Sequence, residues 1–179
     1  MQSNVDYLMV DNDFPDSWVE LYNPSEEDIN IQGYGLGINN DVESSYKLLS
    51  QYVLPSKGHV VLYCDKENRD LHTNFRVDSG KGALYLFDEK ELIIDELHLK
   101  KMPCPNIAFG RKKDGEQQWI YEASPTAGEC NNGLGAENVL PDPEFSIHGG
   151  IYKDEISLRV TIPPVDLPEH DSDAQRGCS

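Results

Sequence analysis

The sequence has 179 residues, with 15 Lys or Arg against 32 Asp or Glu, which gives a formal net charge of −17. This length fits one full domain and part of a second. The negative charge repels nucleic acid and anionic lipid surfaces, so we expect no nucleic-acid binding. No run of about 18 apolar residues is present, so we also expect no membrane insertion.

Short alternating segments separated by turn residues predict an all-β fold. In the first of them Val19 and Leu21 alternate with more polar neighbours, and Pro24 follows as a stop because proline cannot donate to a β-ladder. Residues 88–91 join two apolar segments as a hairpin. The further strands are expected at residues 29–34, 46–49, 52–54, 59–64, 83–87, 92–97, 106–110 and 118–122. Their regular spacing, with no sustained helical period, indicates a β-sandwich or barrel.

The composition changes after residue 131. Residues 132–140 are rich in Asn and Gly and are predicted to form a linker. Residues 156–162 alternate like a strand, which Pro163 and Pro164 end. A single hairpin-sized piece buries too little surface to stand alone. We therefore expect residues 141–179 to be either a truncated second β module or a segment docked on the sandwich.

The order of several motifs resembles that of a lamin-tail domain. These are Trp-Val-Glu-Leu-Tyr-Asn at residues 18–23, Gly-Tyr-Gly-Leu at 33–36, Phe-Gly-Arg at 109–111 and Ser-Pro-Thr-Ala-Gly-Glu-Cys-Asn at 124–131. The resemblance implies an immunoglobulin-like β-sandwich over residues 1–131 that binds and scaffolds and is not an enzyme. Members usually begin with an extra strand of the form Ile-Asn-Glu before a segment like residues 2–4. We therefore expect that strand to be missing or replaced, and one sheet edge to be unpaired.

Two further segments point to a bacterial secreted member of this family. Residues 72–75 (His-Thr-Asn-Phe) are similar to bacterial members, and residues 145–158 resemble the start of a chitobiase C-terminal-like, fibronectin-associated module. The Tyr-Thr-x-Asp-Gly-Ser segment that usually continues this module is absent. The resemblance implies an extracellular or cell-surface bacterial protein whose downstream domains are missing from this chain.

The expected function is non-catalytic protein or surface adhesion, with a protein or a cell-surface glycan as the partner. The alternative is a carbohydrate-binding accessory module that targets an attached enzyme. That alternative requires a planar row of aromatic side chains on one exposed face. The candidates for a binding face are three tyrosines and one basic cluster: Tyr34, Tyr46, Tyr52, Arg111, Lys112 and Lys113. The cluster is expected on a hairpin loop, either solvated or against an acidic partner.

An acidic segment near the N-terminus offers alternate oxygen donors for calcium, from Asp11, Asp13 and Asp16. A solvated turn is the simpler interpretation, because the EF-hand glycine and terminal glutamate are missing and Pro15 restricts the loop. We expect no other cofactor.

Some polar residues are expected to serve the fold. Glu20 lies within a strand and is predicted to accept hydrogen bonds from loop backbone. His72 is predicted to make a local hydrogen bond, and Trp18 to pack in the core. Cys104 and Cys130 flank the last part of the sandwich and are either bridged or free.

Overall fold

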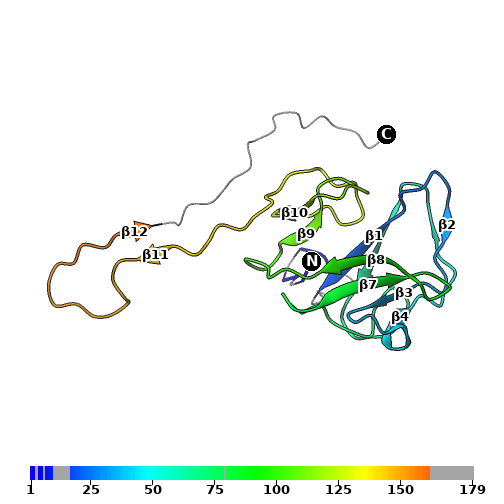
Figure 1. Cartoon of the computed structure of the whole chain (residues 1–179), viewed down its shortest axis with the longest axis horizontal. Helices are drawn as coiled ribbons and strands as arrows, with labels where there is room; N and C mark the ends of the chain where they lie inside the picture. The colour runs from blue at the N-terminus through cyan, green and yellow to red at the C-terminus, as the bar shows by residue number, and fades with distance from the viewer. Residues whose placement is uncertain (3, 6, 10–16, 79, 162–179) are drawn as a thin grey trace. The chain divides into compact units, whose positions relative to one another are not determined.

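The computed structural model describes residues 1–2, 4–5, 7–9, 17–78 and 80–161, and it separates two units along the chain. The first unit covers residues 1–137 and the second begins at Asn138 (Figure 1). No helix in these described residues has the length and apolar character needed to cross a membrane.

Antiparallel strands build the first unit. A four-stranded sheet has the order β4-β3-β7-β8, and three strand pairs, β1-β6, β2-β5 and β9-β10, accompany it. The elements are β1 (Trp18–Tyr22), β2 (Ile29–Asn30), β3 (Gly35–Gly37), the 3-10 turn η1 (Val42–Ser44), β4 (Tyr46–Lys47), β5 (Val53–Leu54), β6 (His59–Tyr63), β7 (Ala83–Phe87), β8 (Ile93–His98), β9 (Ala108–Arg111) and β10 (Trp119–Glu122). The predicted all-β, immunoglobulin-like sandwich is confirmed, including the hairpin between β7 and β8.

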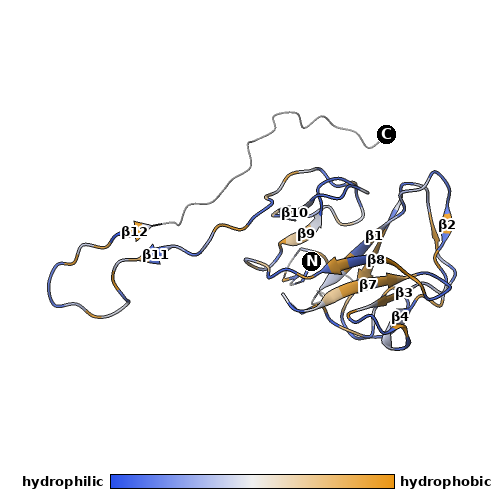
Figure 2. Cartoon of the chain, in the orientation of Figure 1, coloured by the Kyte–Doolittle hydropathy of each residue, from blue (hydrophilic) through white to orange (hydrophobic). Residues whose placement is uncertain are grey.

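The main core lies on one face of β6. Val60 and Leu62 are 4% and 0% exposed, because alternate residues of a strand point to the same face. They belong to one buried cluster with Leu36 of β3 and Leu84 of β7. Apolar residues, orange in Figure 2, gather along β3 and β7 accordingly. This burial on one face fixes the register of β6, since a slip by one residue would expose the apolar set.

The other face of the β1-β6 pair is also covered. Trp18 of β1 is buried in a second, smaller cluster with Ala108 of β9, and Val61 of β6 packs against it. The predicted burial of Trp18 is therefore confirmed. The covering layer consists of β9, β10 and residues 123–131, which we call the closing segment. Two polar residues on this face of β1, Glu20 and Tyr22, are consequently enclosed instead of facing bulk water.

Part of the predicted linker belongs to the first unit. Tyr121 of β10 and Ala136 exchange backbone hydrogen bonds of 2.7 and 3.0 Å. Residues 133–136 therefore run beside β10, which differs from the expectation of a linker over residues 132–140. The alternation of β10 leaves an open backbone edge that this segment pairs with, which composition alone does not reveal.

Replacing Gly135 with alanine should destabilise the first unit by about 1–2 kcal/mol, the range of modest overpacking. A Cβ atom at Gly135 would lie 2.4 Å from the Tyr121 carbonyl oxygen and 2.9 Å from Ile120 Cδ1, so the segment would have to move. Urea unfolding followed by tryptophan fluorescence measures the effect. Gly149→Ala is the matched control, because a Cβ there meets nothing within 4 Å. Equal midpoints for both variants would contradict this packing.

The second unit holds one short antiparallel pair, β11 (Glu144–Phe145) with β12 (Val160–Thr161). The strand expected at residues 156–162 is thus confined, among the described residues, to β12. Phe145, Ile151 and Leu158 are 59%, 102% and 52% exposed. Within the described residues this unit therefore has no buried apolar core of its own, as expected for so short a hairpin.

Candidate binding site beside β1

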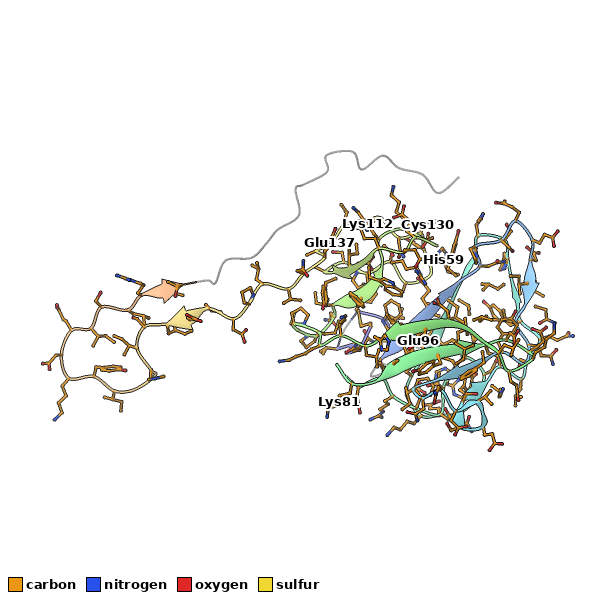
Figure 3. All side chains as sticks on the ribbon, viewed as in Figure 1. His59, Lys81, Glu96, Lys112, Cys130 and Glu137 are labelled. Carbon is orange, nitrogen blue, oxygen red and sulfur yellow. The ribbon has the colours of Figure 1, made fainter. Side chains whose placement is uncertain are left out.

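The opening strand and the closing segment meet through a buried polar network. Gly128 donates its backbone N–H to Glu20 Oε2, so the predicted loop contact of Glu20 is confirmed. Nearby, His59 Nε2 of β6 lies 3.2 Å from Asp114 Oδ1, and both side chains are more than nine-tenths buried. The His59 contact lacks hydrogen-bond geometry and is an electrostatic one. Figure 3 labels His59 and Cys130 at the same end of the unit.

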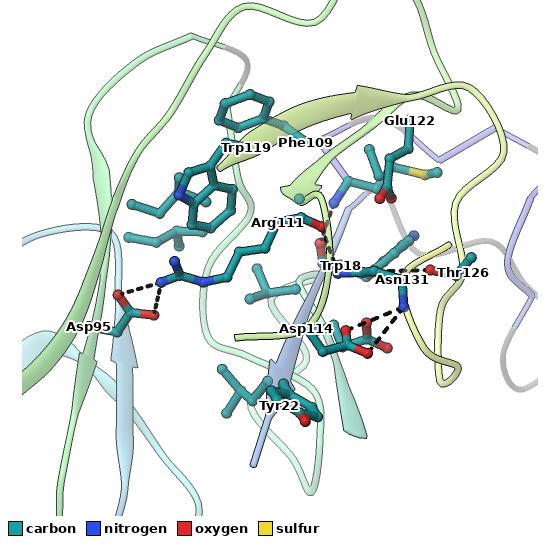
Figure 4. A pocket seen from close by; sticks show the side chains of 18 of the residues that line it. Trp18, Tyr22, Asp95, Phe109, Arg111, Asp114, Trp119, Glu122, Thr126 and Asn131 are labelled. Atoms are coloured by element: carbon teal, nitrogen blue, oxygen red, sulfur yellow. Dashed lines mark hydrogen bonds and ion pairs between the residues drawn. The ribbon is translucent and has the colours of Figure 1, made fainter. Parts of the chain in front are cut away.

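Asn131 ties this network to β9. Its backbone N–H donates to Asp114 Oδ2 at 3.2 Å, and its side-chain amide donates to the Arg111 carbonyl at 2.8 Å. Thr126 donates its hydroxyl to Asn131 Oδ1 at 3.0 Å. Figure 4 shows these bonds converging on Asn131. The polar motif residues at the two ends of the sandwich therefore hold the closing segment against β1.

A cavity of about 310 Å³ runs beside β1, between this strand and the strands β8 and β9. We call it the β1 groove. Its apolar wall comes from residues that also pack against the main core, and its polar groups come from β8, β9 and β10. The lining includes Val19, Leu21, Leu86, Leu97, Asp95, Arg111, Trp119 and Glu122. This volume lies at the lower end of the range for ligand pockets, roughly 300–1,000 Å³.

Arg111 stands at the mouth of the β1 groove (Figure 4). Its guanidinium carbon lies 4.7 Å from the centroid of the Trp119 ring, and Nη2 is 3.1 Å from Asp95 Oδ2. Phe109 stacks on Trp119 with 5.5 Å between centroids. A guanidinium placed over an indole and paired with a carboxylate is held in one orientation. Arg111 is thus engaged within the domain and does not form one solvated cluster with the exposed Lys113.

Glu122 lies at the inner end of the groove with little compensation for its charge. It is 3% exposed, and Oε1 has no hydrogen-bond partner. Burial, followed by repulsion from Glu20, raises the pKa of Glu122 to about 7. Burial likewise raises the pKa of Glu20. Trp18 Nε1 is also buried without a partner and lines the same groove. The groove therefore offers an acceptor and a donor whose hydrogen bonds are unfilled, an arrangement that costs stability in the absence of a ligand.

The sequence analysis did not single out Glu122, His59 or Asp114 as parts of a site. A signal was present for Glu122, since the alternation of β10 places it on the same buried face as Ile120. A charged residue at an apolar position of a strand is worth testing as a binding group.

The predicted tyrosines do not form an exposed row. Tyr46 is 4% exposed and donates its hydroxyl to the Arg69 carbonyl at 2.9 Å, so its place on a binding face was wrong. Tyr34 and Tyr52 are half-buried and pack against the main core. The aromatic platform that the carbohydrate-binding alternative requires is therefore not formed by these three residues.

The calcium candidates Asp11, Asp13 and Asp16 lie outside the described residues. Within the described part of the chain, Asp65, Glu67 and His72 place potential metal-ligating atoms within 4.8 Å of one another. His72 Nδ1 contacts Asp65 Oδ2 and Arg69 pairs with Glu67, so these groups already satisfy one another as a local ion cluster. The local hydrogen bond predicted for His72 is confirmed.

The cysteines differ in state. Cys130 is disulfide-bonded, whereas Cys104 is a free, exposed thiol, so these two are not bridged to each other. Cys64 is fully buried, and burial raises the pKa of its thiol to about 12. Such a thiol is unreactive at neutral pH.

Comparison with known families places the fold. A model of the Lamin Tail Domain matches residues 3–101. The chain belongs to the lamin tail domain family. This immunoglobulin-like family generally serves as a non-catalytic protein-interaction module. No curated protein and no solved structure gave a match. The matched range ends before β9, yet the structure packs β9, β10 and the closing segment onto the domain, which extends to residue 137.

Proposed function

We propose that this lamin-tail domain is a protein-binding adhesion module of a larger extracellular or cell-surface bacterial protein. The observation that carries this proposal is the free edge of the four-stranded sheet. β8 is the last strand of that sheet, and at its start Leu92, Ile93 and Ile94 are 60%, 49% and 51% exposed. Three consecutive exposed apolar residues on an edge strand form a surface for strand addition by a partner.

Two observations support an extracellular location. Cys130 is disulfide-bonded, and disulfides persist chiefly in oxidising compartments. The net charge of −17 favours solubility outside the cell and disfavours contact with nucleic acid. The exposed apolar residues of the second unit are consistent with a hairpin that packs in a larger bacterial architecture, as the resemblance to a chitobiase-like module implies.

A protein partner is favoured over a glycan. Glycan-binding faces present planar aromatic rings, whereas the exposed residues at the start of β8 are aliphatic. The backbone of an edge strand offers hydrogen bonds that suit another polypeptide. Asp95 and Glu96 on the same strand add negative charge and thus favour a partner with a basic surface.

The test uses the full 179-residue chain immobilised and exposed to an array of bacterial secreted and surface proteins, with a glycan array in parallel. We expect protein ligands, and we expect Ile94→Lys to weaken their binding at least tenfold because it places a charge on the apolar edge. Val53→Lys is the control, since Val53 is equally exposed at 56% but lies on β5. Binding unchanged by Ile94→Lys would sink the β8 contact, and glycan binding alone would replace the protein partner. Turnover of any ligand by the isolated chain would overturn the non-catalytic assignment.

A further inference from the structure

We propose that the β1 groove binds an extended segment of a partner polypeptide in which a basic residue lies between two apolar residues. This second contact goes beyond the proposed β8 surface, because it uses another strand edge and other side chains. Each contact can fail without the other.

The first argument is the hydrogen-bond pattern of β1. Asn23 N donates to Gly58 O at 3.0 Å, and Ser17 O accepts from Cys64 N at 2.8 Å. Alternate residues of an antiparallel strand direct their backbone groups to opposite edges. The odd-numbered residues of this stretch therefore bond to β6, and residues 18, 20 and 22 direct their N–H and C=O groups to the other edge.

That other edge is filled at one position. Met1 and Trp18 exchange backbone hydrogen bonds of 2.8 and 3.0 Å. Among the described residues no strand pairs with Glu20 or Tyr22 on this side. The edge therefore offers two residues in register with a pairing that has already begun at Trp18. A segment antiparallel to β1 can continue that pairing along the groove.

The second argument is the shape of the β1 groove. All five residues of β1 line it, while β8 and β9 line the opposite wall. The space thus follows the free edge over the length of the strand. A neighbouring strand lies about 4.8 Å away in a sheet, so the backbone of an added segment falls within this space.

The third argument is the unfilled hydrogen-bonding capacity of Glu122. Its carboxylate is 3% exposed, lines the groove, and has an oxygen without a partner. Glu20 repels it electrostatically, and Asp114 does so to a smaller extent. A group that is both cationic and a hydrogen-bond donor would satisfy the free oxygen and remove this repulsion. The lysine or arginine of a polypeptide meets both requirements.

Strand geometry then gives the order of residues in the partner. Side chains directly opposite each other on paired strands share a face. The residue opposite Glu20 therefore lies on the face of Glu20 and is the basic one. Its two neighbours lie on the face of Val19 and Leu21, which packs against the main core, and are apolar.

The probe is the peptide acetyl-Thr-Val-Lys-Val-amide, titrated into the isotopically labelled full chain and followed by NMR. We expect shifts concentrated at the amides of Glu20, Tyr22 and Gly110, with millimolar or tighter affinity. The same peptide with Glu in place of Lys should bind at least tenfold more weakly. A peptide N-methylated at the lysine should lose binding as well, because it cannot donate to the Glu20 carbonyl.

Protein variants separate the charge from the fold. Glu122→Gln should weaken the lysine peptide about tenfold and leave the glutamate peptide unchanged. The control Glu155→Gln removes an equal charge from an exposed position in the second unit and should leave both unchanged. No shifts on β1 at 10 mM peptide, equal affinity for the two peptides, or full binding of the N-methylated peptide would each overturn the proposal.

Discussion

Replacing Asp114 with alanine is expected to lower the free energy of unfolding by about 3 kcal/mol, the range found when one partner of a buried ionic contact is removed. Asp114 faces His59 at 3.2 Å and accepts the Asn131 backbone N–H, so its loss leaves two buried polar groups without this partner. Chemical denaturation at pH 7 measures the effect. Hydrogen exchange at the Asn131 amide should accelerate in parallel, because the closing segment loses its anchor.

Two variants define the origin of this loss. Asp114→Asn keeps an acceptor for Asn131 and should cost only about 1 kcal/mol, the net value of a hydrogen bond. Asp154→Ala removes an exposed carboxylate from the second unit and should stay within about 0.5 kcal/mol of the unchanged protein. A loss for Asp114→Ala no larger than that for Asp154→Ala would show that the network does not hold the closing segment.

The stability of the domain is expected to rise as the pH falls from 8 to 5 through the titration of Glu122. Its pKa is about 7 in the folded chain against an ordinary value of 4.5. A raised pKa means that the folded state binds the proton more tightly than the unfolded state does. This contribution is complete below about pH 4.5 and is lost as the pH rises through 7.

The size of the Glu122 effect follows from the cost of its ionised form. Each tenfold difference in proton affinity is worth 1.36 kcal/mol, and solvent in the groove screens part of it, so about 2 kcal/mol is expected. Glu122→Gln should be more stable than the parent chain by this amount at pH 8 and equal to it at pH 5. Urea unfolding at both pH values provides the measurement, with Glu155→Gln as the control for a lost surface charge. An equal difference at both pH values would rule out this titration.

Local patterns were sufficient for most of the strands. The alternation of Val60 and Leu62, with turn residues on either side, predicts β6 because one buried face requires period two. The same argument predicts β7, β8 and their hairpin. It fails for the second unit, where residues 156–162 alternate but pair over two residues alone, since no core lies beneath them.

The candidate site was less accessible to sequence reasoning, because its parts come together through long-range contacts. Glu20 and Gly128 are 108 residues apart in the chain, and His59 and Asp114 are 55 apart. Composition predicted that Tyr46 and Arg111 lie on a binding face. The structure buries Tyr46 and places the Arg111 guanidinium over Trp119, since both side chains gain more from internal partners than from solvent. Intrinsic residue preferences do not contain such pairings.

The closing segment has a practical meaning for how this domain should be delimited. The family match ends at residue 101, and a boundary drawn there would remove β9, β10 and residues 123–131. Trp18, Glu20 and His59 would then face water on a sheet that is otherwise enclosed on both sides. A fragment cut by homology alone would carry a sticky face that the intact domain never presents, and binding measured with it would report that wound instead of the biology.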